Sequence, residues 1–272
     1  MRAIGMGVAM AGLFAVRASA QQLPASDSTA LARLNASPRH GEWVMVPAGP
    51  GDSVRAWVAY PERRDRAPVV LVIHEIFGLT DWIRAVADQL AAEGFIAIAP
   101  DLLSGKGPNG GGTESVDQQG AVALIRTLAQ EDVTRRLIAA ARYATALPAA
   151  RNAVGSVGFC WGGSNSFALA TSWPDLGAAV VYYGTSPAAD ALARVRAPVL
   201  GLYGGDDARV GATVPPAQAQ MQQLGKRYEV HMFEGAGHGF LRDQSGRSGA
   251  NQRAAEAAWP STVAFLRTAL GR

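Results

Sequence analysis

A six-residue motif around the only cysteine of the chain places the strongest constraint on its fold. Residues 158–163 read Gly-Phe-Cys-Trp-Gly-Gly, with Cys160 as the third residue. An apolar, β-prone run (153–157) leads into the motif, and an Ala-rich stretch of helical character (164–171) leads out of it. Glycines beside a central residue are typical of a very tight turn, in which flanking Cβ atoms would collide. The sequence therefore predicts a strand, a sharp turn and a helix, with Cys160 at the turn.

This context is typical of a nucleophile elbow, G-x-S-x-G, with the sulfur of Cys160 in place of a serine oxygen. The turn aims the central side chain at the start of a helix, where free backbone N–H groups and the helix dipole favour a thiolate. The alternative interpretation is a small buried cysteine after a core strand, since free cysteine is among the most buried residue types.

Apolar runs alternate with helical segments along the chain, and no linker or internal repeat divides it. This alternation predicts a single α/β domain with a mostly parallel, doubly wound sheet of about seven to eight strands. Strands are predicted at 67–74, 95–99, 153–159, 178–183, 198–203 and 229–233, after a hairpin of 44–47 and 54–60. Helices are predicted at 82–93, 118–129, 133–147, 164–171, 188–194, 215–225 and 251–270, the last kinked or interrupted by Pro260.

The first twenty residues have the composition of a secretory signal peptide. Arg2 supplies a positive charge, residues 3–16 are small and apolar, and Ala-Ser-Ala at 18–20 has the form of a signal-peptidase site. We expect cleavage after Ala20 and a secreted or periplasmic protein without stable membrane insertion. A retained membrane anchor is the alternative, but the apolar run is short and Arg17 interrupts it. Residues 21–43 form a polar arm of uncertain order, and residues 44–272 form the domain.

Charge and composition exclude several classes of function. The chain has 25 basic and 22 acidic residues, and its scattered arginines form no basic patch of the kind that binds nucleic acid. A single cysteine excludes an internal disulfide, and the four histidines have no metal-ligand spacing, so we expect no metal and no cofactor. A lone thiol in an oxidising compartment is a liability, which favours a chemical role for Cys160.

A nucleophile needs a base, and the base needs a carboxylate that orients it. The loop after the strand at 198–203 carries Asp206 and Asp207, and the loop after the strand at 229–233 carries His238. Nucleophile, acid and then histidine is the chain order of α/β-hydrolases. Of the two acids we select Asp207, because Asp206 directly follows two glycines and is better placed to shape the turn.

The end of the first buried strand supplies a fourth group. Acyl transfer requires two N–H donors for the developing oxyanion, one after the nucleophile and one from an early strand–loop junction. The backbone N–H groups of Trp161 and Ile76 are the candidates. Glu75 directly follows the same apolar strand, a position that disfavours a plain surface carboxylate.

Together these segments resemble the dienelactone hydrolase family, whose members are cysteine-nucleophile α/β-hydrolases, over roughly residues 45–270. The resemblance rests on His-Glu-Ile-Phe-Gly (74–78), Ala-Pro-Asp-Leu (99–102), the motif at 158–163, Tyr-Tyr-Gly (182–184), the Asp207 loop and Gly-His-Gly-Phe (237–240). It implies an α/β-hydrolase fold and a Cys160–His238–Asp207 triad that cleaves an ester or lactone through a thioester acyl-enzyme. It also implies that Glu75 holds the resting thiol and that Arg242 holds a substrate carboxylate.

The chain departs from the family pattern in three places. A second family arginine is absent near Gly105, where only Lys106 is charged; the serine after the histidine is Gly239; and residues 104–112 form a Gly-rich loop. We therefore predict a monomeric carboxylic ester hydrolase for a small-molecule ester or lactone, and the dienelactone itself stays open. The alternatives are a general secreted carboxylesterase and a non-enzymatic ligand-binding protein with a redox-sensitive Cys160. The complete set of triad, oxyanion loop and Glu75 favours an enzyme.

Overall fold

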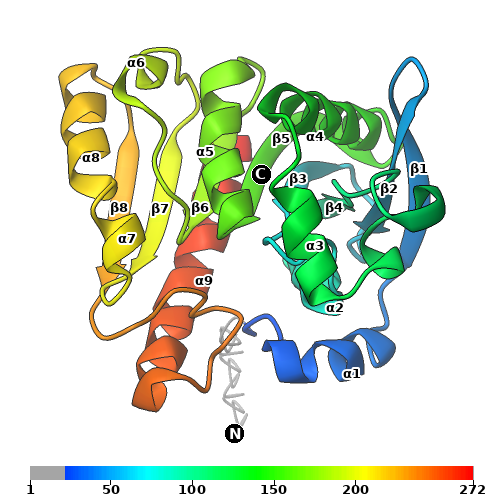
Figure 1. The fold of residues 1–272 in the computed structure, drawn as a ribbon, viewed down its shortest axis with the longest axis horizontal. Helices are drawn as coiled ribbons and strands as arrows, with labels where there is room; N and C mark the ends of the chain where they lie inside the picture. Colours follow the sequence, from blue (N-terminus) through cyan, green and yellow to red (C-terminus); the bar gives the residue numbers. More distant parts are fainter. Residues whose placement is uncertain (1–21, 272) are drawn as a thin grey trace, which may run out of the picture.

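The computed structural model describes residues 22–271, and its centre is one eight-stranded sheet. The strand order is β1-β2-β4-β3-β5-β6-β7-β8; β1 and β2 form an antiparallel hairpin, β2 pairs with β4 antiparallel, and every other pairing is parallel (Figure 1). The strands are β1 Gly41–Gly49, β2 Asp52–Ala59, β3 Ala67–Ile73, β4 Ile96–Pro100, β5 Ala150–Phe159, β6 Ala178–Tyr182, β7 Val199–Gly204 and β8 Tyr228–Phe233. The predicted signal peptide and its cleavage site lie outside the described residues.

Helices cover both faces of this sheet, as the alternating pattern predicts. The helices are α1 Ala30–Asn35, α2 Asp81–Ala92, α3 Gln118–Ile125, α4 Gln130–Thr145, α5 Trp161–Ser172, α6 Ala189–Leu192, α7 Ala208–Gly211, α8 Val214–Gln223 and α9 Ala250–Leu270. Helices α2 and α9 bury Trp82 and Trp259 on one face, together with Val70 and Val72 of β3. Helices α4, α5, α6 and α8 cover the other face. No helix within residues 22–271 is long and apolar enough to span a bilayer.

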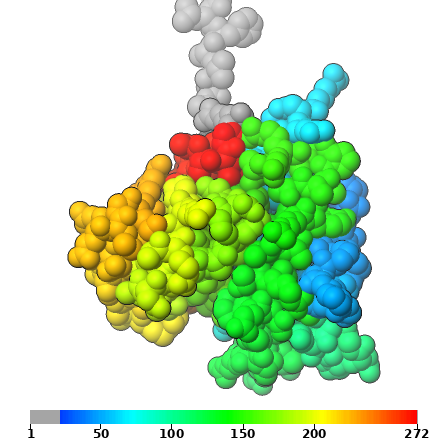
Figure 2. All heavy atoms as spheres, turned by 90° about the horizontal axis from the view of Figure 1, so that it is seen from above, coloured from blue at the N-terminus to red at the C-terminus, as the bar shows by residue number. Residues whose placement is uncertain are grey.

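The two edges of the sheet come from different parts of the chain, with β1 at one edge and β8 at the other. Seen from above, the yellow and orange elements from β7 to β8 lie on one side, and the blue hairpin and the green segments lie on the other (Figure 2). The nucleophile motif belongs to β5 and α5, in the middle of the sheet, so the loops of both halves reach it.

The sequence predicted every one of these strands, and most boundaries lie within three residues of the observed ones. The short helix α7 was missed, because four residues are too few to show a helical period. The expected interruption at Pro260 was wrong: α9 runs continuously from Ala250 to Leu270. The burial of Trp259, Val263 and Leu266 offsets the backbone hydrogen bond that a proline cannot make.

The arm before the first strand packs onto the domain. Strand β1 begins at Gly41, slightly before the predicted boundary at residue 44, and α1 lies against α2. The indole Nε1 of Trp82 donates to the carbonyl oxygen of Ala25 at 2.9 Å, and Ala25 and Ala30 are both buried. The backbone N–H of Asp27 donates to the carbonyl of Arg242 at 3.0 Å. Residues 22–40 therefore reach the loop that follows the predicted catalytic histidine.

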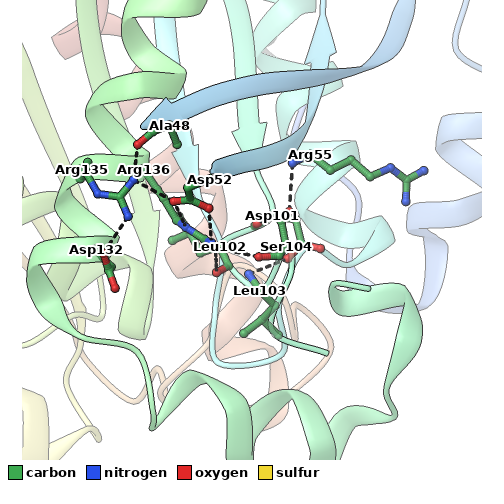
Figure 3. Close-up of polar contacts among 10 residues, drawn as sticks. All are labelled: Ala48, Asp52, Arg55, Asp101, Leu102, Leu103, Ser104, Asp132, Arg135 and Arg136. Carbon is green, nitrogen blue, oxygen red and sulfur yellow. Dashed lines mark hydrogen bonds and ion pairs between the residues drawn. The ribbon is translucent and has the colours of Figure 1, made fainter. Parts of the chain in front are cut away.

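An ion pair between the buried Arg136 and the partly buried Asp52 fixes the loop that follows β4 (Figure 3). The guanidinium of Arg136, on α4, binds both carboxylate oxygens of Asp52 at 2.7 and 3.1 Å. Its Nη1 also donates to the carbonyl oxygens of Leu102 and Ser104, both at 2.9 Å. Burial alone would raise the pKa of Asp52, but hydrogen bonds from Arg136 and Arg135 hold it below its ordinary value. Helix α4 thus ties the β1–β2 turn to the start of the Gly-rich loop.

Candidate active site

Cys160 lies at a strained turn between β5 and α5. Its φ of 56° and ψ of −118° are uncommon for a residue with a side chain, and such strain costs on the order of 1–3 kcal/mol. A Cβ at Gly158 would overlap the carbonyl oxygen of Gly162, and a Cβ at Gly162 would overlap that of Ile73. The two glycines allow strand, turn and helix to approach closely, and the turn lifts the Cys160 side chain out of the sheet, as the motif predicts.

The structure brings Asp207 and His238 together. The Nδ1 atom of His238 lies 2.5 Å from Oδ2 of Asp207, although 31 positions separate them in sequence. The Asp207 carboxylate is almost buried, and its Oδ1 also accepts from the backbone N–H of Val210 at 3.3 Å, at the N-terminus of α7. Asp206 instead pairs with Arg247 in an exposed position, at 3.2 Å. Of the two acids, Asp207 is therefore the one that orients the imidazole.

Two backbone N–H groups face the sulfur of Cys160. They belong to Trp161 and Ile76, and hydrogen bonds from both favour the thiolate. The Ile76 loop is held by the buried His74, whose Nδ1 donates to the carbonyl of Glu75 at 2.7 Å and whose Nε2 accepts from Leu102 N at 3.1 Å. Burial lowers the pKa of His74, so it stays neutral and keeps this tautomer. Sequence reasoning assigned His74 no role beyond its place in a motif. In the structure its two hydrogen bonds hold the predicted oxyanion loop.

Glu75 is a nearly buried carboxyl beside Cys160, and its counter-ion is Arg242. The Nε of Arg242 lies 3.1 Å from Oε2 of Glu75, without the alignment of a hydrogen bond. The Nη1 of Arg242 reaches Asp27 of the N-terminal arm at 3.2 Å, and the guanidinium lies 5.1 Å from the ring centre of Phe77. The pKa of Glu75 is raised to about 7, because the effect of burial exceeds the opposing effect of Arg242, and Asp27 adds a smaller increase.

Cys160 is a weak acid in this arrangement. Burial and, to a smaller extent, the neighbouring Glu75 raise the pKa of its thiol to about 11. The N–H groups of Trp161 and Ile76 and the charge of Arg209 act in the opposite direction. The site therefore holds a protonated thiol at neutral pH, and a base must remove its proton before it attacks.

Comparison with known proteins shows the family of the chain. The sequence profile of the dienelactone hydrolase family matches residues 54–270. The chain belongs to the dienelactone hydrolase family. A candidate carboxymethylenebutenolidase of Saccharolobus solfataricus is 32% identical over 250 residues, covering 80% of this chain and 95% of that protein. A candidate 2-oxo-3-(5-oxofuran-2-ylidene)propanoate lactonase of Bradyrhizobium is 31% identical over 241 residues, 83% of this chain and 93% of that protein.

A solved structure of this family has the same fold. The crystal structure of a candidate dienelactone hydrolase from Klebsiella pneumoniae superimposes with a TM-score of 0.74 at 29% identity, over 84% of this chain and 98% of that chain. The sheet of this family member, with helices on both faces, is thus the α/β-hydrolase fold. The protein is a hydrolase of ester or lactone bonds.

Cys160 opens into a cavity of about 450 Å³. Its lining comprises Ile76, Gln130, Cys160, Trp161, Ser164, Asn165, Ala168, Tyr183, Thr185, Ser186, Pro187 and Arg209. Arg242 does not line this cavity; it lines a neighbouring pocket of about 300 Å³ with Asp27 and Phe77. The family resemblance assigned substrate binding to Arg242, and the sequence analysis did not identify Arg209 as a residue of the cavity. Its position two residues after Asp207 was the only sequence signal that could have placed it there.

Hydrogen bonds at its C-terminal end hold the Gly-rich loop near the site. Thr113, just after the loop, donates through N and Oγ1 to the buried carboxylate of Asp101, at 2.8 and 2.7 Å. The same Oγ1 accepts from Leu79 N at 2.9 Å. Within residues 22–271, no cluster of three or more His, Cys, Asp or Glu side chains is arranged to hold a metal ion.

Proposed function

We propose that Cys160, His238 and Asp207 form a catalytic triad that cleaves an ester or lactone through a thioester acyl-enzyme. The observation that carries the proposal is the 2.5 Å contact between Asp207 and His238, in the loops beside the strained Cys160 turn. The carboxylate fixes the tautomer in which Nδ1 carries the proton, and this leaves Nε2 free to act as a base.

In the proposed first step, the thiol proton of Cys160 passes to Nε2 of His238, and the sulfur bonds to the carbonyl carbon. The carbonyl oxygen becomes an oxyanion and accepts from the N–H groups of Ile76 and Trp161. Collapse of this intermediate breaks the bond to the leaving oxygen, which takes the proton from His238. Water, deprotonated by the same imidazole, then cleaves the thioester and regenerates the thiol.

We propose that Glu75 controls the resting state. In the structure the thiol faces the same two N–H groups that the oxyanion needs, and Glu75 disfavours its ionisation. The sulfur must therefore turn away before the substrate carbonyl can occupy that place. Arg242 pairs with both Glu75 and Asp27. We expect an approaching substrate to change these ion pairs, and with them the effect of Glu75 on the ionisation of the thiol.

Formation of the thioester depends on the leaving group of the substrate. An enol ester releases a good enolate leaving group, which returns as a ketone after taking a proton, whereas a simple alkoxide is a poorer leaving group. We therefore expect hydrolysis of activated or enol esters and poor hydrolysis of alkyl esters.

The test compares the purified mature chain with Cys160→Ala and Cys160→Ser on 4-nitrophenyl acetate and on a dienelactone. Turnover by the unaltered chain and loss in Cys160→Ala is the expected result. Vinyl acetate and ethyl acetate extend the test to leaving groups, with faster cleavage of the enol ester expected. Unchanged turnover in Cys160→Ala, or equal rates for the two acetates, would count against the proposal.

We also propose that residues 1–20 direct export and are removed after Ala20. The Ala-Ser-Ala sequence at 18–20 and the apolar run before it support this. Mass measurement of the protein from the periplasm and medium of a bacterial host tests it. A mature chain that begins at Gln21 is expected, and an intact chain in the cytosol would contradict it.

A further inference from the structure

The cavity at Cys160 has a single formal charge in its described lining, the guanidinium of Arg209. The other lining residues are apolar side chains, amides, hydroxyls and the thiol itself. A positive charge in a cavity that otherwise offers only neutral groups sets which substrates enter.

Arg209 has no partner that would neutralise it. It is exposed on α7, and it makes no ion pair with any residue that the structure describes. Arg242, by contrast, is already bound to Glu75 and Asp27. A carboxylate that reached Arg242 would have to displace a buried glutamate, whereas a carboxylate at Arg209 displaces only water.

The fold fixes the position of Arg209 relative to Asp207 and Cys160. Helix α7 starts at the triad acid, whose side chain caps its N-terminus through Val210 N. The Arg209 charge also reaches the Cys160 sulfur, since it favours the thiolate there. An anion at Arg209 therefore sits in the same cavity as a carbonyl bound at Cys160.

We propose that Arg209 is a specificity-determining residue that binds a carboxylate on the substrate, separate from the ester or lactone group that is cleaved. The planar guanidinium matches a carboxylate through two parallel N–H donors, which a neutral group cannot reproduce. The inference rests on the proposed function. The resemblance implies a substrate carboxylate at Arg242, and the inference assigns the recognition of that group to Arg209, in the cavity of Cys160.

Matched ester pairs test this inference. Mono(4-nitrophenyl) glutarate and 4-nitrophenyl pentanoate differ by a carboxylate on the acyl side, and 4-acetoxybenzoate and phenyl acetate differ on the alcohol side. The readout is the ratio of kcat/KM for the anionic ester to that for its neutral partner. We expect a preference for the anionic ester in at least one pair, a fall in that ratio of about tenfold in Arg209→Gln, and partial retention in Arg209→Lys. Arg253→Gln, an exposed substitution on α9, is the control and should leave the ratio unchanged.

Alkylation of the only cysteine gives a second readout that does not need turnover. In each reaction the Cys160 thiolate displaces iodide and forms a thioether. The rate with iodoacetate relative to neutral iodoacetamide should fall in Arg209→Gln and not in Arg253→Gln.

The outcomes separate the two proposals. Cys160-dependent hydrolysis without any anionic preference, or with a preference that Arg209→Gln retains, would overturn the inference and leave the triad standing. Absence of hydrolysis for all four esters would overturn the proposed function and this inference with it.

Discussion

The Nε atom of Arg242 lies 3.1 Å from Oε2 of Glu75, and the same guanidinium reaches Asp27 of the N-terminal arm at 3.2 Å. Three charged side chains from distant parts of the sequence thus meet beside the candidate nucleophile. Because Glu75 is buried and lies next to Cys160, its charge controls both the acidity of the thiol and the stability of the protein.

The first prediction concerns the acidity of the thiol. Glu75→Gln removes the carboxylate that raises the pKa of Cys160, so the thiolate fraction near pH 8 should increase. Alkylation by iodoacetamide at that pH should then be severalfold faster than in the unaltered chain, as measured by mass spectrometry over time. An unchanged or slower rate would show that Glu75 does not act on the thiol.

The second prediction concerns stability against pH. The folded pKa of Glu75 is raised to about 7, above the ordinary value of 4.5, because burial disfavours the charged carboxylate. Its contribution to stability is therefore fully present below pH 4.5 and is lost as pH rises through 7. Between pH 4.5 and pH 8, this group should cost the unaltered chain about 3 kcal/mol relative to Glu75→Gln. Urea unfolding at the two pH values measures it, and a gap between the two proteins that does not change with pH would refute it.

The third prediction tests the orienting carboxylate. Asp207→Asn should lower kcat on an activated ester by on the order of 10³-fold, because the amide favours the wrong imidazole tautomer. Asp206→Asn is the matched control, since the neighbouring carboxylate is exposed and paired only with Arg247. Equal losses in the two variants would show that neither acid has the specific role assigned here.

The fourth prediction concerns the ion pair between the buried Arg136 and the partly buried Asp52. Arg136→Met leaves the carbonyls of Leu102 and Ser104 without their donor and leaves Asp52 with Arg135 alone, and should lower the free energy of unfolding by about 2 kcal/mol. Arg142→Met, on the exposed side of the same helix, is the control, and should have little effect. Chemical denaturation of both variants measures the difference; similar stabilities would contradict the role assigned to Arg136.

Much of the fold and most of the candidate site could be predicted from the sequence because their signals are local. Each strand is an apolar run, and Cys160, Asp207 and His238 each follow such a run, so a parallel sheet brings them to one edge. The glycines at 158 and 162 mark the turn by themselves.

The remaining features depend on contacts between distant segments. The packing of Asp27 against Arg242 and the bond from Trp82 to Ala25 leave no periodic pattern in the sequence. Arg209 belongs to a helix of four residues, which is too short to show a helical period in the sequence. Its proposed role depends on the lack of an ion-pair partner among the described residues, which only the structure shows. Pro260 failed as a helix breaker because tertiary burial outweighed a local preference.

Mass spectrometry of the acyl-enzyme tests the central claim most directly. The purified chain is mixed with 4-nitrophenyl acetate, quenched in acid within the first turnover, digested and mapped. The account predicts one acetyl group on the peptide that contains Cys160, formed at the rate of 4-nitrophenol release and absent from Cys160→Ala. Steady release of 4-nitrophenol with no acetyl group on Cys160, or with the group on another residue, would contradict it.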